Sequence, residues 1–195
     1  MTSDKPIILA SASPRRAELL RQIRLPFEVV IPEVDESRRQ GEIPRDYVRR
    51  LAQSKAAAVR RPERLTLGAD TTVVLDGAVL GKPRDASEGV AMLTALGGRA
   101  HTVLTAVCLG RGGAYESRVV ATEVRFRPIS EALAAAYWRT GEGGDKAGGY
   151  GIQGIGSIFA TRIEGSYSAV VGLPLAETEE LLNAFGFDPW GARLG

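Results

Sequence analysis

The fold begins with the stretch IILASASPRRAELLRQIRLPFEVVI, residues 7–31, in which a strand, a helix and a second strand follow closely. Residues 7–10 are a short apolar run of the kind that a buried strand requires. Ser13 and Pro14 then supply an N-cap and a first helical residue, and apolar residues recur after them at helical spacing. Residues 27–31 form the second strand candidate.

The middle of the chain carries the strongest strand patterns. Residues 65–75 are apolar and β-branched, and Asp76-Gly77 predicts a tight hairpin turn after them. Two long alternating stretches, at about 100–110 and 114–127, are joined by Arg111-Gly112-Gly113. Strands and helices that alternate early, followed by a long hairpin, predict an α/β fold: a mixed β-sheet flanked by helices, in two lobes with a central cleft.

Further helices are predicted where capping residues precede apolar periodicity. One opens at Pro44, and a second begins at Asp85, where Glu88 three residues later completes a capping box. Ser130 caps a helix that runs to Arg139, and residues 175–185 form a closing amphipathic helix. The chain is therefore expected to be one domain over residues 1–195.

Composition excludes several classes of protein. The 195 residues are 44% hydrophobic and 25% charged, which rules out a largely disordered chain. A single cysteine and a single histidine exclude an internal disulfide, a cysteine-based zinc cage and a two-histidine metal site. No apolar run approaches the ~20 residues that span a bilayer, and the apolar run near the first residue is too short for a signal peptide. We therefore expect a cytoplasmic protein without a membrane partner.

The charge balance argues against a nucleic-acid partner. The formal net charge is only +2, although four of the 25 basic residues are lysines and the other twenty-one are arginines. Aromatic residues make up 6% of the chain and do not alternate with basic ones as a base-stacking surface requires. Nucleic-acid binding, which the arginines suggest, is therefore not expected.

Residues 11–16, Ser-Ala-Ser-Pro-Arg-Arg, place a helix N-terminus directly after a strand. Unpaired backbone N–H groups and the positive end of the helix dipole favour phosphate oxygens there, and Arg15 could add a bidentate contact. The simpler alternative is an ordinary N-cap followed by two solvated arginines.

Asp70 lies between an apolar strand and a run of β-branched residues, so solubility alone does not explain a carboxylate at this position. A buried carboxylate needs a cation, a metal or hydrogen-bond donors. Asp70 could hold a divalent metal or take a proton from water. The alternative is a local bond between its side chain and the following backbone.

Two lysines stand in informative positions. Lys55 falls on the apolar stripe of the helix that opens at Pro44, so it either snorkels to water or directs its charge toward an anion. Lys82 follows Gly81 after a short strand, and we treat it as a candidate phosphate contact. The surrounding residues fail the P-loop pattern, because Pro83 stands where Ser or Thr is required.

Two loops complete the candidate site. Residues 32–36 form an acidic loop whose carboxylates, Glu36 among them, suit hydrated Mg²⁺, although such loops are usually only solvated. Residues 141–156 hold eight glycines, and the GxGxxG match within them lacks the strand and helix of a dinucleotide site. Residues 155–163 are instead expected to be strand. Gln153 can donate and accept at once, as the recognition of a nucleobase edge requires.

Together these segments resemble the Maf family of nucleotide pyrophosphatases, and the match runs through nearly the whole chain. Gln153 stands where the branch that acts on 7-methyl-GTP carries an acidic residue, so the chain looks like the branch that acts on dTTP and UTP. The motifs that carry the resemblance are Ser11–Arg16, Val34–Glu36, Leu51–Lys55, Gly68–Thr71, Gly81–Arg84, Asp145–Gly154 and Gly165–Pro174.

The resemblance implies a house-cleaning hydrolase that cleaves dTTP and UTP, with modified pyrimidine nucleotides as further substrates, to a nucleoside monophosphate and pyrophosphate. It also implies a divalent metal cation, Mg²⁺ or Mn²⁺, the elongated Maf and ITPase-like fold, a homodimer and a link to septum formation. The resemblance implies that Asp70 is the general base and that Asp70 and Glu36 are the metal ligands. It implies phosphate contacts from Ser13, Arg15, Lys55 and Lys82. The choice of nucleotide would depend on Arg15, Thr71 and Gln153.

A second hypothesis comes from another class of protein. The chain could be a non-catalytic nucleotide-binding regulator, or an interaction protein in septum formation whose pocket is vestigial. That hypothesis predicts that substitution of Asp70 leaves any division phenotype intact, whereas the enzyme hypothesis predicts loss of turnover.

Overall fold

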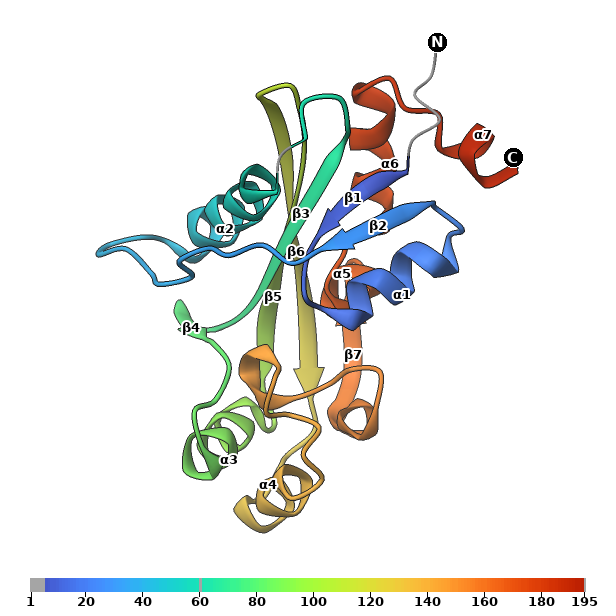
Figure 1. Ribbon diagram of the computed structural model, residues 1–195. Coiled ribbons are helices and arrows are strands. Elements are labelled where there is room, and N and C mark those ends of the chain that lie inside the picture. Colours follow the sequence, from blue (N-terminus) through green and yellow to red (C-terminus); the bar gives the residue numbers. More distant parts are fainter. Residues whose placement is uncertain (1–5, 60, 195) are drawn as a thin grey trace. The chain divides into compact units, whose positions relative to one another are not determined.

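A seven-stranded sheet forms the core of the computed structural model, which describes residues 6–59 and 61–194 (Figure 1). The strands are β1 (Ile7–Ala10), β2 (Phe27–Val30), β3 (Thr66–Leu75), β4 (Ala78–Leu80), β5 (Ala100–Arg111), β6 (Ala114–Phe126) and β7 (Ala160–Glu164). The helices are α1 (Pro14–Gln22), α2 (Pro44–Ala58), α3 (Ala86–Leu96), α4 (Glu131–Trp138), α5 (Tyr167–Val171), α6 (Leu175–Ala184) and α7 (Pro189–Leu194), with 3₁₀ turns η1 (Ala147–Gly149) and η2 (Ile155–Phe159).

The sheet is mixed, as the sequence predicted. Its strands lie in the order β2-β1-β3-β5-β6-β7, and β4 pairs with β3. β1 is parallel to both β2 and β3, whereas β3 with β4 and β6 with β7 are antiparallel. The predicted α/β class, a mixed sheet flanked by helices, is confirmed. In the part of the chain that the structure describes, no helix is long and apolar enough to cross a membrane.

The described residues divide into two compact units. The first takes its residues from 1–70, 105–120 and 172–195, and the second from 71–104 and 121–171. The two units correspond to the two predicted lobes, and each is described below by itself. A cleft between lobes and a single domain over residues 1–195 stay predictions.

The first unit is built on the close approach of β3 to α2. Both elements bury apolar side chains there, among them Leu51 and Leu67. A Cβ atom on Gly68 of β3 would lie 2.2 Å from the Ala52 carbonyl oxygen and 2.6 Å from the Ala56 nitrogen. Only glycine fits this contact, so Gly68 sets the distance between the strand and the helix.

The second unit has an aromatic core. His101, Phe126 and Tyr150 pack edge to face, and the Phe159 ring lies tilted against Phe126 and edge to face against Tyr137. The Nε2 atom of His101 lies 2.8 Å from the Tyr150 hydroxyl, and burial lowers the pKa of His101 to about 4. α3 and α4 lie side by side in this unit (Figure 1).

Two of the three predicted N-caps make their side-chain bond. Asp85 accepts a bond from the Glu88 N–H at 2.9 Å, and Ser130 accepts one from the Leu133 N–H at 3.3 Å. Ser13 occupies the N-cap position of α1 with Pro14 after it, but its side chain makes no capping bond.

One prediction of secondary structure needs correction. Residues 155–163 were expected to be strand, but η2 occupies 155–159 and only β7 is extended. The reason is a contact with a residue outside this segment: the N–H groups of Ile155 and Gly156, at the start of η2, donate to the Glu142 carboxylate and not to a neighbouring strand. The helix expected over 175–185 is confirmed as α6, and a further short helix, α7, follows it.

Candidate active site

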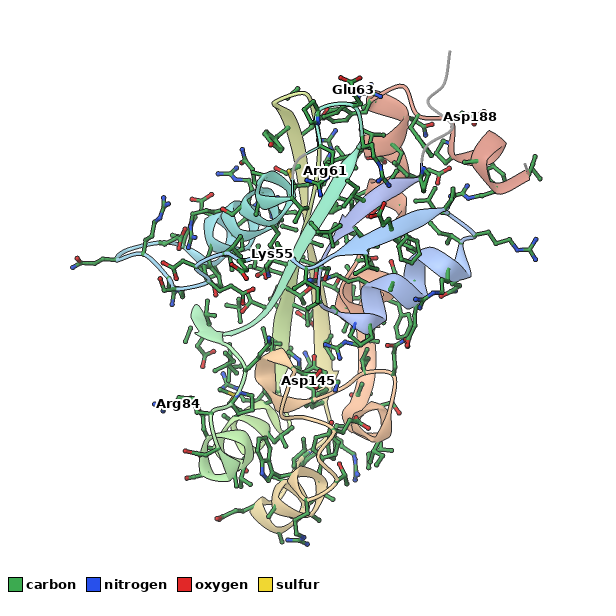
Figure 2. All side chains as sticks on the ribbon, in the orientation of Figure 1. Lys55, Arg61, Glu63, Arg84, Asp145 and Asp188 are labelled. Carbon is green, nitrogen blue, oxygen red and sulfur yellow. The ribbon has the colours of Figure 1, made fainter. Side chains whose placement is uncertain are left out.

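A buried ion pair joins α2 to β3. Gly68 and Asp70 are two residues apart on β3 and so face the same side, toward α2. Lys55, which is labelled in Figure 2, lies on α2. Its Nζ donates to Asp70 Oδ1 at 2.7 Å, and the two side chains are only 9% and 10% exposed. Lys55 therefore does not snorkel to water, and Asp70 has the cationic partner that its buried position demands.

Glu36 joins this pair from the acidic loop after β2. Its Oε1 lies 2.7 Å from the same Lys55 Nζ, and its side chain is 50% exposed. The Tyr47 hydroxyl donates to the Glu36 backbone carbonyl at 2.9 Å and so holds the loop against α2. The acidic loop is therefore not merely solvated, because one lysine draws two carboxylates together.

The environment of Asp70 favours proton acceptance. Burial raises the pKa of its carboxyl group, while the charges of Lys55 and Arg16 oppose that rise. A carboxylate with a raised pKa is a stronger base than an ordinary aspartate and remains held in one place by its ion pair.

The N-terminus of α1 supplies a second cation to the first unit. Arg16 is buried, its Nε donates to the Gly172 carbonyl at 2.8 Å, and its Nη1 donates to Ser11 Oγ at 3.2 Å. Burial lowers the pKa of the Arg16 guanidinium, and the negative charge of Asp70 opposes that effect. Arg15 is half-buried and Ser13 half-buried at the same helix end. The alternative of two solvated arginines is wrong for Arg16.

The carboxylates fit a divalent cation. Glu36 and Asp70 already share one positive charge, the Lys55 ammonium, through one oxygen each. Within residues 6–59 and 61–194, no group of three or more His, Cys, Asp and Glu side chains could hold a metal ion. Mg²⁺ usually takes only one or two protein carboxylates and completes its shell with water and phosphate oxygens. Two carboxylates therefore suffice for the predicted ion.

The second unit carries the other predicted residues. Lys82 is exposed just after β4, Gln153 is exposed in the glycine-rich loop, and Thr71 is half-buried in β3. The Gly148 N–H donates to the Gly81 carbonyl at 3.0 Å, so the segment with Lys82 is fastened to the loop with Gln153.

The structure thus brings some predicted residues together. Glu36, Lys55 and Asp70 are in direct contact, and Ser13 and Arg15 belong to the same unit. Lys82, Thr71 and Gln153 belong to the second unit, and their roles stay predictions.

Sequence reasoning gave no role to two residues of the first unit. Arg16 precedes Leu19 and Leu20 by three and four residues, so the helical spacing that singled out Lys55 also places Arg16 on the buried stripe. Tyr47 lies on α2 two turns before Lys55, so the same helical spacing places both side chains on one face of the helix.

In the first unit a buried acid lies beside a buried lysine, and a second carboxylate and a helix N-terminus belong to the same unit. This combination is typical of proteins that act on phosphate groups. The sequence matches the family described as Maf-like protein over residues 6–185. The chain therefore belongs to the Maf family.

Curated relatives of high similarity carry one name. A Saccharophagus degradans protein named dTTP/UTP pyrophosphatase is 52% identical over 94% of this chain and 90% of its own length. A Vibrio cholerae protein of the same name is 52% identical over 95% of this chain and 100% of its own length. Another of that name, from an Anaeromyxobacter species, is 54% identical over 97% of this chain and 94% of its own length. The solved Staphylococcus aureus Ham1 protein aligns over 65% of this chain and 73% of its own at 16% identity and a TM-score of 0.43.

Proposed function

We propose that this protein hydrolyses dTTP and UTP to the nucleoside monophosphate and pyrophosphate. The observation that carries the proposal is the buried Asp70 carboxylate, held by Lys55 beside Glu36. Membership of the Maf family and relatives about half identical in sequence, each named dTTP/UTP pyrophosphatase, support the substrate.

Asp70 acts as the general base in this proposal. Its carboxylate takes a proton from a water molecule whose oxygen attacks the α-phosphorus. A bond forms between that oxygen and the α-phosphorus, and the bond from the α-phosphorus to the bridging oxygen breaks. Pyrophosphate leaves with the electron pair. Burial raises the pKa of Asp70, which makes its carboxylate a stronger base toward this proton.

The cations stabilise the charge that moves onto the leaving pyrophosphate. Lys55 and Arg15 from the first unit, and Lys82 from the second, are assigned to phosphate oxygens, with Ser13 as a neutral donor. Lys55 also keeps Asp70 and Glu36 in place, so it serves both the base and the substrate.

Glu36 and Asp70 are the residues that would hold the divalent cation, Mg²⁺ or Mn²⁺. When bound, such an ion neutralises phosphate charge and makes a nearby water easier to deprotonate. Tyr47 contributes by fixing the Glu36 backbone, which keeps that carboxylate directed at the Lys55 side of α2.

Arg15, Thr71 and Gln153 are assigned to the choice of nucleotide. A uracil or thymine ring presents a carbonyl and an N3–H, and one amide group can pair with both. A base that lacks either group leaves the Gln153 amide unsatisfied, which lowers its affinity.

A panel of nucleoside triphosphates, assayed for pyrophosphate and orthophosphate with and without Mg²⁺ or Mn²⁺, tests this function. Metal-dependent pyrophosphate from dTTP and UTP supports it, and orthophosphate as the product refutes it. Asp70→Asn should abolish turnover. Asp46→Asn is the matched control, because that carboxylate is half-exposed on α2 and pairs with Arg49, three residues further along the same helix, at 2.6 Å.

The other implications of the family stay predictions. A homodimer is tested by sedimentation of the purified chain, and a cytoplasmic location by fractionation. The alternative role, a non-catalytic regulator of septum formation, is favoured if Asp70→Asn retains a division phenotype while its turnover is lost.

A further inference from the structure

Glu142 organises the glycine-rich loop of the second unit. It lies in the segment after α4, and its carboxylate reaches across the loop to three donors. Oε1 accepts bonds from the Tyr137 hydroxyl at 2.8 Å and the Gly156 N–H at 2.9 Å, and Oε2 accepts one from the Ile155 N–H at 2.7 Å. Hydrogen bonds to a charged acceptor are the stronger kind, so Glu142 is a firm anchor.

Tyr137 extends this anchor to the other side of Gln153. Its hydroxyl donates to Glu142 and accepts a bond from the Gly151 N–H at 3.0 Å. Its ring packs edge to face on Phe159 with centroids 5.1 Å apart, which fixes the hydroxyl in space. Glu142 and Tyr137 together therefore hold the backbone both before and after Gln153.

The glycines of the loop make room for this pair. A Cβ atom on Gly154 would lie 2.2 Å from Glu142 Oε2. A Cβ atom on Gly156 would lie 2.9 Å from the Tyr137 hydroxyl and 2.7 Å from the Gly151 carbonyl oxygen. The carboxylate and the hydroxyl reach the backbone only because these positions carry no side chain.

We propose that Glu142 and Tyr137 are positioning residues for nucleotide selection, which hold the loop so that Gln153 presents its amide to the pyrimidine ring. The proposal rests on the proposed function. Gln153 is exposed, and the place of its amide depends on the backbone of residues 151–156. A loop ordered before binding loses less conformational freedom when the base arrives. Glu142 itself touches no reacting atom in this account.

The decisive measurement is the ratio of kcat/KM for UTP to that for CTP, whose ring has an amino group where uracil has a carbonyl. Glu142→Gln removes the charge and one acceptor and keeps the shape. We expect the ratio to fall about tenfold, mainly through a higher KM for UTP, with kcat changed less than about threefold. Glu131→Gln, at an exposed position in the first turn of α4, is the matched control and should leave the ratio unchanged.

A double-variant cycle tests whether Glu142 acts through Gln153. Gln153→Ala should by itself abolish the preference for UTP. In that background, Glu142→Gln should change the ratio by less than about twofold, because the amide it positions is gone. Additive effects, or an equal fall for UTP and CTP in Glu142→Gln, would overturn the proposal.

Hydrogen exchange gives a second readout that does not depend on turnover. In Glu142→Gln the amides of Ile155 and Gly156 should lose protection, whereas the Gly148 amide, bonded to the Gly81 carbonyl, should keep it. Unchanged protection of Ile155 and Gly156 would refute the anchor. Tyr137→Phe keeps the ring and should expose the Gly151 amide in the same way.

Failure of the proposed function has a separate signature. A wild-type protein that releases no pyrophosphate from dTTP or UTP refutes the pyrophosphatase. Calorimetry then tests the positioning role. It measures the affinities for UMP and CMP, and the ratio of the two is compared between the wild type and Glu142→Gln. The same ratio of affinities in both proteins would refute the positioning role of Glu142.

Discussion

Replacement of Lys55 by methionine removes the charge that joins two carboxylates and keeps the length of the side chain. Asp70 would then be a carboxylate only 10% exposed, without the ammonium at 2.7 Å. We expect the variant to be markedly less stable than the wild type, and inactive, because the base and its partner are both disturbed.

The magnitude follows from the burial of the two ion pairs. Glu36 is 50% exposed, so water screens its pair with Lys55, and that pair contributes about 0–1 kcal/mol. The pair with Asp70 is buried on both sides, and removal of one member of such a pair costs about 3–5 kcal/mol. The charge of Arg16 offsets part of that cost. We therefore expect a loss of about 3 kcal/mol in the free energy of unfolding.

Urea denaturation at pH 7 measures this loss, with Lys82→Met as the control. Lys82 is exposed, so its substitution should change stability by less than about 0.5 kcal/mol. The double variant Lys55→Met/Asp70→Asn removes the carboxylate that Lys55→Met leaves without its ammonium, while Arg16 keeps its bonds to Gly172 and Ser11, so it should regain at least half of the lost stability. A single variant as stable as the wild type, or a double variant no better than the single, would refute the reasoning.

Three further predictions concern the fold and the loops that hold the site. Gly68→Ala should destabilise the protein by about 1–3 kcal/mol in urea, whereas Gly144→Ala, where the nearest atom to a new Cβ is 3.9 Å away, should be nearly neutral. Tyr47→Phe loses its bond to the Glu36 carbonyl, so the Mg²⁺ concentration for half-maximal activity should rise about fivefold, a cost of about 1 kcal/mol; an unchanged Mg²⁺ dependence would exclude this role. His101 has a folded pKa of about 4 against 6.5 in the unfolded chain, so its contribution is complete above pH 6.5 and is lost as the pH falls toward 4. Wild type should thus lose about 3 kcal/mol more than His101→Gln between pH 7 and pH 4, and parallel pH profiles would contradict this.

The sequence was informative wherever local chemistry decides the structure. The strand and helix of residues 7–22, the hairpin turn at Asp76-Gly77 and the caps at Asp85 and Ser130 depend on neighbouring residues, and all were predictable. Lys55 was recognised because a charge on an apolar stripe needs a partner. Its partners, however, are carboxylates of the same chain, which helical spacing alone does not reveal.

Contacts between distant segments limited the prediction. Arg16 binds the carbonyl of Gly172, which is 156 residues away, and no local pattern encodes that bond. The glycine-rich loop was predicted to lack a helix, but its anchor was missed, because only the folded chain brings Glu142 to the amides of Ile155 and Gly156. The strand expected over 155–163 was wrong for the same reason: the Glu142 side chain binds the N–H groups of Ile155 and Gly156, which in a strand would pair with a neighbouring strand.

Hydrolysis of UTP in ¹⁸O-labelled water tests the central chemistry most directly. If Asp70 directs water to the α-phosphorus, mass spectrometry will find the label in UMP and none in pyrophosphate, and Asp70→Asn will form neither product. Label in the pyrophosphate would place the attack on the β-phosphorus and contradict the account.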